Sequence, residues 1–200
     1  MAQIQSIMKS SYILPQKEVD AQNYYYFYNT FNQAELNILE NGLTKLSFEK
    51  AVTVGGGGDD IRSSQIKWIP QHPQFEWLYF KMMNLALEAN QNLWDFDLHT
   101  INDNIQYTEY YASQNGHYDW HQDVGPNNLS QRKLSIVIQL NDDYEGGELQ
   151  IWQGGQSYQT LPKQKGFTTC FPSYMMHRVL PVTEGIRKSL VLWIGGGRYR

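Results

Sequence analysis

The sequence predicts a mainly β fold with flanking helices, in which a β-sandwich or jelly-roll core is backed by helices from the N-terminal part. Two segments before about residue 95 have a helical apolar period, whereas six segments after it are short and rich in β-branched or aromatic residues. Gly, Pro, Asn and Asp separate those six segments, as is typical of turns. We therefore expect a single domain over residues 1–200, helical over about 1–95 and with a jelly-roll core over about 96–196.

Two helices are predicted before the β region. In TFNQAELNILENG, Asn32 and Glu35 have the spacing of a capping box, and Phe31 and Leu36 occupy hydrophobic-staple positions. Leucines then recur at helical spacing: Leu36, Leu39 and Leu43. A second helix is predicted after Pro73, where five apolar side chains share one face: Phe75, Leu78, Met82, Ala86 and Ala89.

Six strands are predicted after the helices, and several are apolar on both faces. They are NIQYTEYY (104–111), RKLSIVIQL (132–140), GELQIW (147–152), KGFTTCFP (165–172), HRVLPV (177–182) and IRKSLVLWI (186–194). In the last of these, Leu190, Leu192 and Ile194 alternate with Val191 and Trp193. Such a strand is covered on both faces, so we expect helices on one side and a second sheet on the other.

Composition excludes several classes of protein. The net charge of -4 and the pI near 5.7 indicate an acidic protein without the basic surface that nucleic acid requires, so nucleic acid is not expected as a partner. No apolar run approaches the roughly 20 residues of a membrane span, and the N-terminus lacks the apolar core of a signal peptide. One cysteine, Cys170, excludes an intrachain disulfide and is interpreted as a packing residue. We expect a cytoplasmic protein, of unknown oligomeric state.

The segment GHYDWHQDVG (116–125) suggests a metal site. In a strand, His121 and Asp123 would point to the same side and supply two ligands to one ion. His177, which opens a later predicted strand, is the natural third ligand. Two histidines and one carboxylate leave coordination positions open, as non-haem Fe(II) requires. Each residue alone has an ordinary structural alternative, and the remaining histidines are interpreted as structural or surface residues: His72, His99 and His117.

Arg187 is the second unusual feature. Strand alternation places it on one face with Ser189, Val191 and Trp193. A buried arginine is costly unless it meets an anion, and its planar fork suits a carboxylate, with the Ser189 hydroxyl as an added donor. An internal Asp or Glu partner explains the same residue equally well.

These residues together resemble the Fe(II)- and 2-oxoglutarate-dependent oxygenases, and within them the prolyl 4-hydroxylase-like branch of bacteria and their phages. The resemblance covers about residues 60–196. His-x-Asp in YDWHQD, the Gly-Gly turn in NDDYEGGEL, the FPS strand, the distal His and the Arg-x-Ser all occur in order. It implies a double-stranded β-helix (jelly-roll) core.

The resemblance also implies roles for individual residues. His121, Asp123 and His177 would be the iron ligands and the catalytic centre. Arg187 would form a salt bridge with the distal carboxylate of 2-oxoglutarate, beside the Ser189 hydroxyl. The implied cofactors are Fe(II), 2-oxoglutarate as cosubstrate and O2, with ascorbate as reductant. The retained Asp123 favours hydroxylation over halogenation, because related halogenases have a small residue there.

One tyrosine should contact the same distal carboxylate. Tyr110 fits best, through the Gln-x-x-x-Tyr run from Gln106. The segment between Tyr110 and His121 departs from the family's tighter Tyr-x-x-Gly-x-x-Tyr-x-x-His, so Tyr111 and Tyr118 are alternatives.

Substrate residues are predicted around the segment VGGGGDDIRSSQIKWI. Its glycines, 55–58, would allow a lid to close, and Arg62 and Trp68 would line the cleft beneath it. A simple exposed loop and strand is the alternative. Trp193 either shapes the substrate pocket or fills the core. Tyr118 and Trp120 either contact substrate or cosubstrate, or support the ligand strand.

Three functions follow from these residues. The first is hydroxylation of a C–H bond of a peptidyl proline, with release of succinate and CO2. The second is the same chemistry on a free amino acid or another small molecule. The third is a non-catalytic jelly-roll module that binds metal or sugar, and such a module has no need of Arg187, Ser189 and Tyr110 together.

Overall fold

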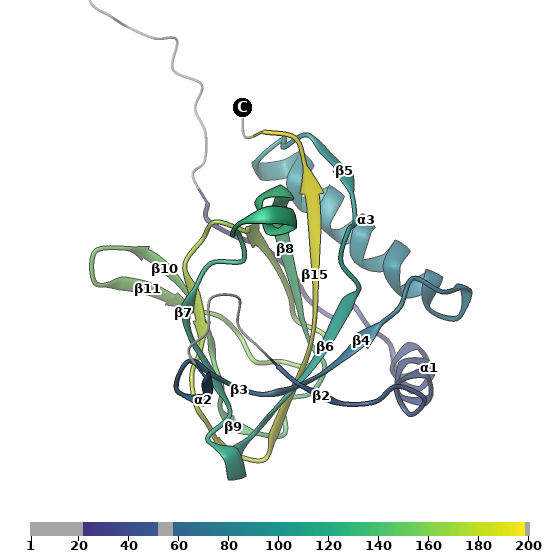
Figure 1. Cartoon of the computed structure of the whole chain (residues 1–200), viewed down its shortest axis with the longest axis vertical. Helices are drawn as coiled ribbons and strands as arrows, with labels where there is room; N and C mark the ends of the chain where they lie inside the picture. The colour runs from purple at the N-terminus through teal and green to yellow at the C-terminus, as the bar shows by residue number, and fades with distance from the viewer. Residues whose placement is uncertain (1–21, 52–57, 199–200) are drawn as a thin grey trace, which may run out of the picture.

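The fold was analysed in a computed structural model that describes residues 22–51 and 58–198 (Figure 1). Helices occur at α1 (Gln33–Leu43), α2 (Gly58–Ile61) and α3 (Glu76–Leu93), with 3-10 turns at η2 (Pro73–Phe75), η3 (Ala112–Gln114) and η4 (Asn127–Gln131). Within the described ranges, no helix is both long enough and apolar enough to cross a bilayer. Both predicted helices are confirmed.

The larger antiparallel sheet has the order β1-β12-β8-β15-β6-β4-β2, with β5 also paired to β15. Its strands are β1 (Tyr25–Phe27), β2 (Glu49–Lys50), β4 (Gln65–Ile69), β5 (Leu98–Thr100), β6 (Ile105–Tyr111), β8 (Arg132–Gln139), β12 (Thr168–Pro172) and β15 (Ile186–Gly196). The long strand β15 lies in the middle of this sheet, between β8 and β6.

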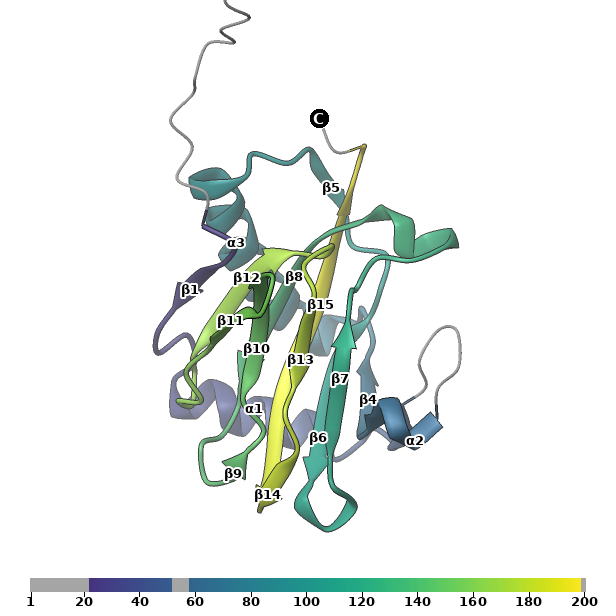
Figure 2. The same ribbon diagram turned by 90° about the vertical axis from the view of Figure 1, so that its left-hand side faces the viewer.

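The smaller sheet has the order β11-β10-β13-β7-β3, and it faces the larger sheet across the core (Figure 2). Its strands are β3 (Arg62–Ser63), β7 (His117–His121), β10 (Leu149–Gly154), β11 (Ser157–Thr160) and β13 (His177–Val179). A two-stranded ladder of β9 (Glu145–Gly146) and β14 (Val182–Glu184) closes one end. Two antiparallel sheets with helices on one side form the jelly-roll core that the sequence predicts.

Strand β15 divides the interior into two cores, as its alternation predicts. Leu190, Leu192 and Ile194 belong to the core that α1 and α3 cover. Val191 and the face that it shares point to the core between the two sheets. Helices therefore cover one face of the larger sheet and the smaller sheet covers the other, as Figure 1 shows.

Local sequence signals explain where the helices begin. The Asn32 side chain accepts a hydrogen bond from the Glu35 backbone N–H, and the Glu35 carboxylate accepts one from the Asn32 N–H, which completes the capping box. The buried face of α3 consists of the predicted residues Leu78, Met82, Ala86 and Ala89, with Asn90 in addition. Cys170 is fully buried in the same core, where burial raises the pKa of its thiol, so it packs as predicted.

The structure departs from the sequence-based prediction at two places. The segment before residue 95 is not only helical, because β1, β2, β3 and β4 extend the sheets. These strands have two to five residues, too few to show a period of their own. The predicted strand HRVLPV is in fact two strands, since Pro181 lies between β13 and β14, which belong to different sheets.

Candidate metal centre and adjoining cavity

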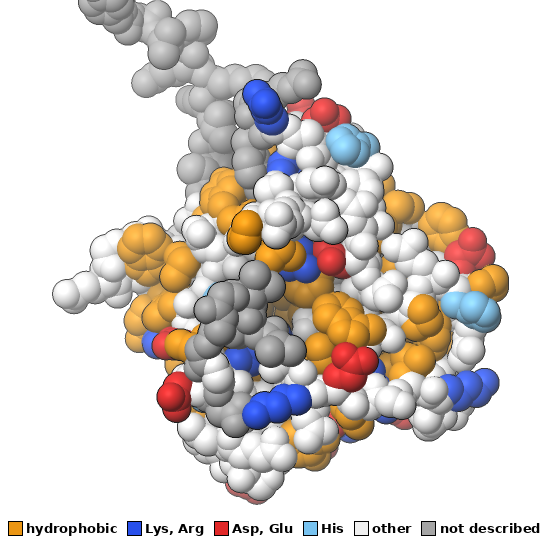
Figure 3. Space-filling model, in the orientation of Figure 1, with side chains coloured by type: hydrophobic (Ala, Val, Ile, Leu, Met, Phe, Trp, Pro, Cys, Tyr) orange, Lys and Arg blue, Asp and Glu red, His pale blue; other side chains and the backbone are white. Residues whose placement is uncertain are grey.

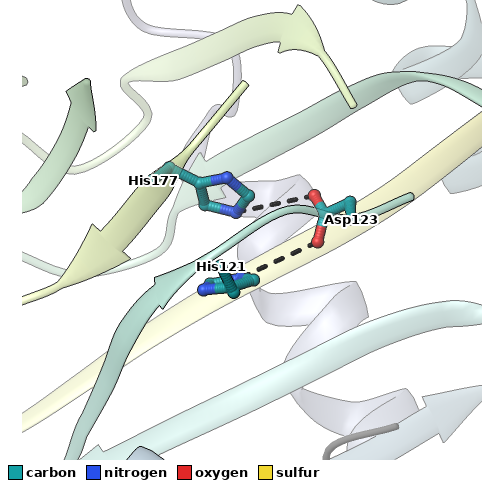
Figure 4. A group of neighbouring side chains, drawn as sticks. All are labelled: His121, Asp123 and His177. Atoms are coloured by element: carbon teal, nitrogen blue, oxygen red, sulfur yellow. Dashed lines mark ion pairs between the residues drawn. The ribbon is translucent and has the colours of Figure 1, made fainter. Parts of the chain in front are cut away.

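Three side chains from the smaller sheet converge at one point (Figure 4). His121 ends β7 and His177 begins β13, and the two residues are paired across the ladder. Asp123 lies just beyond the end of β7 rather than within it, which differs from the prediction. Its backbone N–H donates to the carbonyl oxygen of Ser173 at 2.9 Å, and this bond holds the turn that points the carboxylate toward the histidines.

The geometry of these side chains suits a single ion. His121 Nε2 lies 3.8 Å from Asp123 Oδ1, and His177 Nε2 lies 3.6 Å from Asp123 Oδ2. One ligand atom from each residue lies within 4.8 Å of the others. Two atoms that each lie about 2.1 Å from one metal are at most about 4.2 Å apart, and both histidine–aspartate separations are within this limit. The structure therefore brings the three predicted ligands together.

Backbone carbonyls fix the tautomer of both imidazoles. His121 Nδ1 is 2.8 Å from the carbonyl oxygen of Asp119, and His177 Nδ1 is 2.9 Å from that of Met175. Because a carbonyl oxygen can only accept, each Nδ1 carries the proton and each Nε2 keeps its lone pair for a ligand. Neutral histidines oriented in this way are the usual arrangement in metal sites.

Asp123 is supported by residues that the sequence did not single out. Its Oδ2 accepts a hydrogen bond from Ser135 Oγ at 2.6 Å, and Ser135 Oγ is 3.0 Å from Ser173 Oγ. The Arg132 guanidinium donates to the Asp123 carbonyl oxygen at 3.3 Å. Ser135 is fully buried on β8. The signal that would have identified it is a hydroxyl on the inward face of a strand that is otherwise apolar.

The protonation states of the centre are those that a cation requires. Burial, reinforced by the neighbouring His177, lowers the pKa of His121 to about 3, although Asp123 opposes the shift. Burial alone would raise the pKa of Asp123, but His177, His121 and the Ser135 hydroxyl bring that pKa below its ordinary value. An ionised carboxylate beside a neutral imidazole is the state in which both bind a metal.

Arg187 lies in the same cavity with an incomplete set of partners. Its side chain is 1% exposed, and Nη1 donates to Ser189 Oγ at 3.1 Å. Its guanidinium carbon lies 5.2 Å from the centre of the Tyr110 ring. Within the described part of the chain, Arg187 Nε and Nη2 have no hydrogen-bond partner, nor do the buried hydroxyls of Thr108 and Tyr144. A buried cation surrounded by free donors requires an anion, and this favours a bound carboxylate over an internal one.

The three tyrosines differ in direction. Tyr110 and Tyr118 line the cavity, whereas the Tyr111 hydroxyl donates to the Glu109 carboxylate. The Tyr118 ring stacks on His121 with ring centres 3.4 Å apart. Tyr110 is paired with Arg187 across the ladder between β6 and β15. Tyr110 therefore lies beside the cation and Tyr118 beside the metal ligands, while Tyr111 contacts neither.

The predicted substrate residues also line this cavity, whose volume is about 570 Å³. Arg62 is buried rather than exposed: its Nε donates to Ser64 Oγ at 2.9 Å and its Nη2 to Gln106 Oε1 at 3.0 Å. Trp68 on β4 and Trp193 on β15 both line the cavity and lie next to each other, with ring centres 6.5 Å apart. Hydrophobic side chains gather around the hollow at the centre of Figure 3.

Two predicted features lie elsewhere. Trp120 does not line the cavity, because it alternates with His121 and contacts Arg178 instead. Of the glycines proposed as a lid, residues 55–57 lie outside the described residues, and Gly58 begins α2.

Comparison with known proteins finds similarity to one family. The model of the 2OG-Fe(II) oxygenase superfamily matches residues 105–195, which include all three candidate ligands together with Arg187 and Ser189. A PKHD-type hydroxylase from Synechococcus sp. (strain CC9311) is 41% identical over 85 residues, which is 42% of this chain and 38% of the relative. One from Alteromonas mediterranea is 37% identical over 65 residues, 32% of this chain and 28% of the relative.

Residues 105–195 of this chain are therefore similar to the 2OG-Fe(II) oxygenase superfamily, and about two fifths of the chain is similar to a PKHD-type hydroxylase. Enzymes of that superfamily use Fe(II), 2-oxoglutarate and O2, and the His121, Asp123 and His177 set described above can hold a metal. The alignment spans less than two fifths of the length of these relatives.

Solved oxygenase structures share the fold of this chain. The prolyl hydroxylase of Trichoplax adhaerens, in complex with a hypoxia inducible factor oxygen degradation domain peptide fragment, has a TM-score of 0.73 at 17% identity and covers 88% of this chain and 85% of its own. A Pseudomonas putida prolyl-4-hydroxylase has a TM-score of 0.67 at 20% identity and covers 89% and 95%.

Proposed function

We propose that this protein is an Fe(II)- and 2-oxoglutarate-dependent dioxygenase that hydroxylates a C–H bond of a peptidyl proline. The observation that carries the proposal is that one cavity contains both a set of metal-ligand atoms and a buried arginine with free donors. His121, Asp123 and His177 offer free lone pairs and one negative charge, and Arg187 offers free donors and one positive charge. A 2-oxo dicarboxylic acid with a metal satisfies both.

The roles of the residues follow from these two features. Two neutral imidazoles and one carboxylate would hold Fe(II). Arg187, with Ser189 and Tyr110 beside it, would hold the distal carboxylate of 2-oxoglutarate. With both bound, one oxygen atom of O2 enters succinate, CO2 leaves, and the other oxygen atom becomes the new hydroxyl group.

The remaining residues position the site and its substrate. Tyr118 covers the His121 ring and Ser135 holds the Asp123 carboxylate, so the ligands lose little freedom when the metal binds. Arg62, Trp68 and Trp193 line the cavity where the substrate C–H must lie. Flat aromatic walls with one fixed cation suit a proline ring whose peptide carbonyls accept hydrogen bonds from the arginine.

One observation supports a peptide over a free amino acid. Solved proteins of similar fold are named prolyl hydroxylases, and the Trichoplax enzyme was solved with a peptide fragment.

The decisive experiment measures succinate formed from 2-oxoglutarate with Fe(II), ascorbate and O2. It compares the wild type with His177→Ala and with His99→Ala, an exposed histidine far from the centre, as the matched control. Each protein is assayed alone, with free proline and with a proline-rich peptide.

We expect peptide-stimulated succinate formation by the wild type and by His99→Ala, and none by His177→Ala. Stimulation by free proline alone would replace the peptidyl substrate with a small molecule. Bound iron with no succinate under any condition would contradict an oxygenase and favour a metal-binding module.

A further inference from the structure

The outer face of the smaller sheet carries exposed aromatic side chains where polar ones are usual. Residues that alternate with the metal ligands point outward, so Trp120 and Arg178 lie on the reverse of His121 and His177. With them lie Trp152, Tyr158 and Met176, and we call these five residues the outer aromatic face: Trp120, Trp152, Tyr158, Met176 and Arg178. Hydrophobic side chains gather over β10 and β11 at the left of Figure 3.

This face is hollowed and apolar. Trp152 is 41% exposed and Tyr158 is 51% exposed, and the two are paired directly across the β10–β11 ladder. They border a hollow of about 400 Å³. The Trp152 indole N–H already donates to the Gly155 carbonyl oxygen at 2.9 Å, so its ring faces rather than its donor are available to a ligand. The outer strands of a sandwich ordinarily present polar residues, and an aromatic patch there indicates a binding surface.

Arg178 is held rigidly within the face. Its guanidinium carbon lies 4.5 Å from the Trp120 ring centre and 5.6 Å from that of Tyr158. Its Nε donates to Gln150 Oε1 at 2.8 Å, and the amide of Gln150, which is 4% exposed, donates to Thr160 Oγ1 at 2.9 Å. This fixes the plane of the guanidinium before any ligand arrives.

The charge of Arg178 is not balanced locally. Its only hydrogen-bond partner in the described ranges is Gln150, a neutral side chain, and no described Asp or Glu forms an ion pair with it. The faces of the Arg178 guanidinium lie against the Trp120 and Tyr158 rings, and its Nε donates to Gln150. The two terminal nitrogens are therefore available to a ligand. A planar fork with free terminal nitrogens is complementary to a carboxylate.

The combination selects a class of ligand. A single cation in a protein of net charge -4 does not attract a polyanion such as nucleic acid or an anionic membrane, which need several cations. Flat aromatic faces suit the rigid ring of proline, and extended proline-rich segments bind in aromatic-lined grooves. A carboxylate-bearing segment that also contains proline satisfies both parts of the face.

The face is also close to the cavity. Gln122 lines the cavity, and its amide donates to the Tyr174 carbonyl oxygen at 2.5 Å. Trp120 is two residues before Gln122, and Met176 is two residues after Tyr174. A polypeptide that leaves the cavity over Gln122 therefore reaches the outer aromatic face within a few residues, since an extended chain advances about 3 Å per residue.

We infer that the outer aromatic face is a docking site for an acidic, proline-containing segment of the polypeptide substrate, whose target residue enters the cavity. The identity of this ligand as substrate rests on the proposed function. Binding to the face does not require turnover.

The binding test uses metal-free protein and three fluorophore-labelled, proline-rich peptides of equal length. They differ at one residue, which follows a proline and is Glu (the Pro-Glu peptide), Gln (the Pro-Gln peptide) or Lys (the Pro-Lys peptide). Fluorescence anisotropy compares the wild type with Arg178→Gln and Trp152→Ala. Lys45→Gln removes one exposed charge elsewhere and is the matched control, and Phe80→Ala removes an exposed aromatic ring from α3. Thermal melting confirms that each variant is folded.

We expect the wild type to bind the Pro-Glu peptide at least about tenfold more tightly than the Pro-Gln peptide, the size of a hydrogen bond to a charged group. Arg178→Gln should abolish this preference, Trp152→Ala should weaken both peptides, and neither control should change them. Equal affinities in all five proteins, or a preference for Pro-Lys, would overturn the inference. The inference would also be overturned if the wild type self-associates and Trp152→Ala does not, because a second copy of the chain would then occupy the face.

The turnover test compares a short proline peptide with the same peptide extended by an acidic proline-containing tail. The tail should lower KM in the wild type, and Arg178→Gln should restore the KM of the short peptide without changing kcat or the half-saturating 2-oxoglutarate concentration. If the wild type and Arg178→Gln turn over both peptides with the same kinetics, the docking site is refuted and the proposed function stands. An absence of turnover by the wild type with any peptide would refute the proposed function instead.

Discussion

The two ends of the cavity between the sheets contrast in how completely their polar groups are satisfied. At one end, each histidine donates its Nδ1 hydrogen to a carbonyl and Asp123 accepts from Ser135, so the hydrogen bonds are made before any ligand binds. At the other end, Arg187 and the nearby Thr108 hydroxyl have buried polar atoms that no described residue satisfies.

The difference indicates what each end binds. A metal needs lone pairs held in place, so its ligands are anchored through their other atoms. A carboxylate needs donors, so the donors at the opposite end are left open. The His121, Asp123 and His177 end is therefore stable without a metal. At the Arg187 end, the buried unpaired cation lowers the free energy of unfolding until an anion binds.

The largest effect is expected at the ligand end. Asp123→Ala removes one of three ligands and the only negative charge among them, and we expect metal affinity to fall by more than about 100-fold, the upper range for losing a supporting residue. Titration of the metal-free protein with Co(II), followed by visible absorption, measures this. Asp119→Ala is the control, because it retains the backbone carbonyl that orients His121. Equal affinity in the Asp123 and Asp119 variants would disprove the ligand assignment.

Arg187→Met tests the other end through two readouts of opposite sign. We expect the half-saturating 2-oxoglutarate concentration to rise by about 100-fold, because one partner of a buried charge pair is lost. Without ligands, the free energy of unfolding should increase by about 1–4 kcal/mol, because an unpaired buried cation is replaced by an apolar side chain.

Urea unfolding of the metal-free protein measures the second effect, with the exposed Lys45→Met as control. A destabilised Arg187 variant would mean that the guanidinium is already satisfied in the free protein and that the two ends do not differ as described.

Ser135→Ala sharpens the comparison within the ligand end. The Asp123 carboxylate loses its hydrogen bond of 2.6 Å, and we expect metal affinity to fall by about tenfold. At saturating metal the dependence on 2-oxoglutarate should be unchanged, because Arg187 is untouched. The exposed Ser157→Ala is the control. A change in 2-oxoglutarate dependence with no change in metal affinity would show that Ser135 acts on the Arg187 end and not on the metal ligands.

Gly147→Ala tests the packing behind Arg187. A Cβ at this position would lie 3.1 Å from Arg187 Cδ and 2.9 Å from Val182 Cγ2, and the backbone has φ +66°. We expect a loss of about 2–3 kcal/mol in unfolding free energy and a several-fold rise in the 2-oxoglutarate requirement. Gly155→Ala has a similar φ of +57° with no atom within 4 Å, so it should lose only about 1–2 kcal/mol. Equal losses would show that contact with Arg187 contributes nothing.

The smallest effect lies outside the cavity and provides a baseline. Burial alone would raise the pKa of Glu35, but Lys81 at 2.8 Å and the Asn32 backbone N–H lower it below the ordinary value of 4.5. A lowered pKa in the folded state stabilises above the ordinary pKa and is lost as the pH falls through the folded value. Glu35→Gln should therefore cost about 0.5–1 kcal/mol at pH 7 and nothing in strong acid, as measured by urea unfolding. A cost that persists in acid would mean that the capping geometry, and not the charge, is responsible.

Most of the framework was readable in the sequence because it depends on local patterns. The period of α3 and the alternation of β15 assign each side chain to a face, and burial follows those assignments. The capping box of α1 is local as well. The short strands β1 and β2 were not predicted, because two or three residues show no period and pair only where a longer strand offers an edge.

The sequence by itself determined the identities of the site residues: a His-x-Asp pair, a distal histidine, and an Arg-x-Ser on one strand face. Tertiary structure alone decided which partners they have. Pairing of β7 with β13 brings His121 to His177, and β8 brings Ser135 to Asp123, because contacts between strands depend on sheet order and register rather than on sequence distance. Among the described residues, sheet order also places no carboxylate beside Arg187. No local pattern predicts this, because the partners of a side chain depend on everything that packs around it.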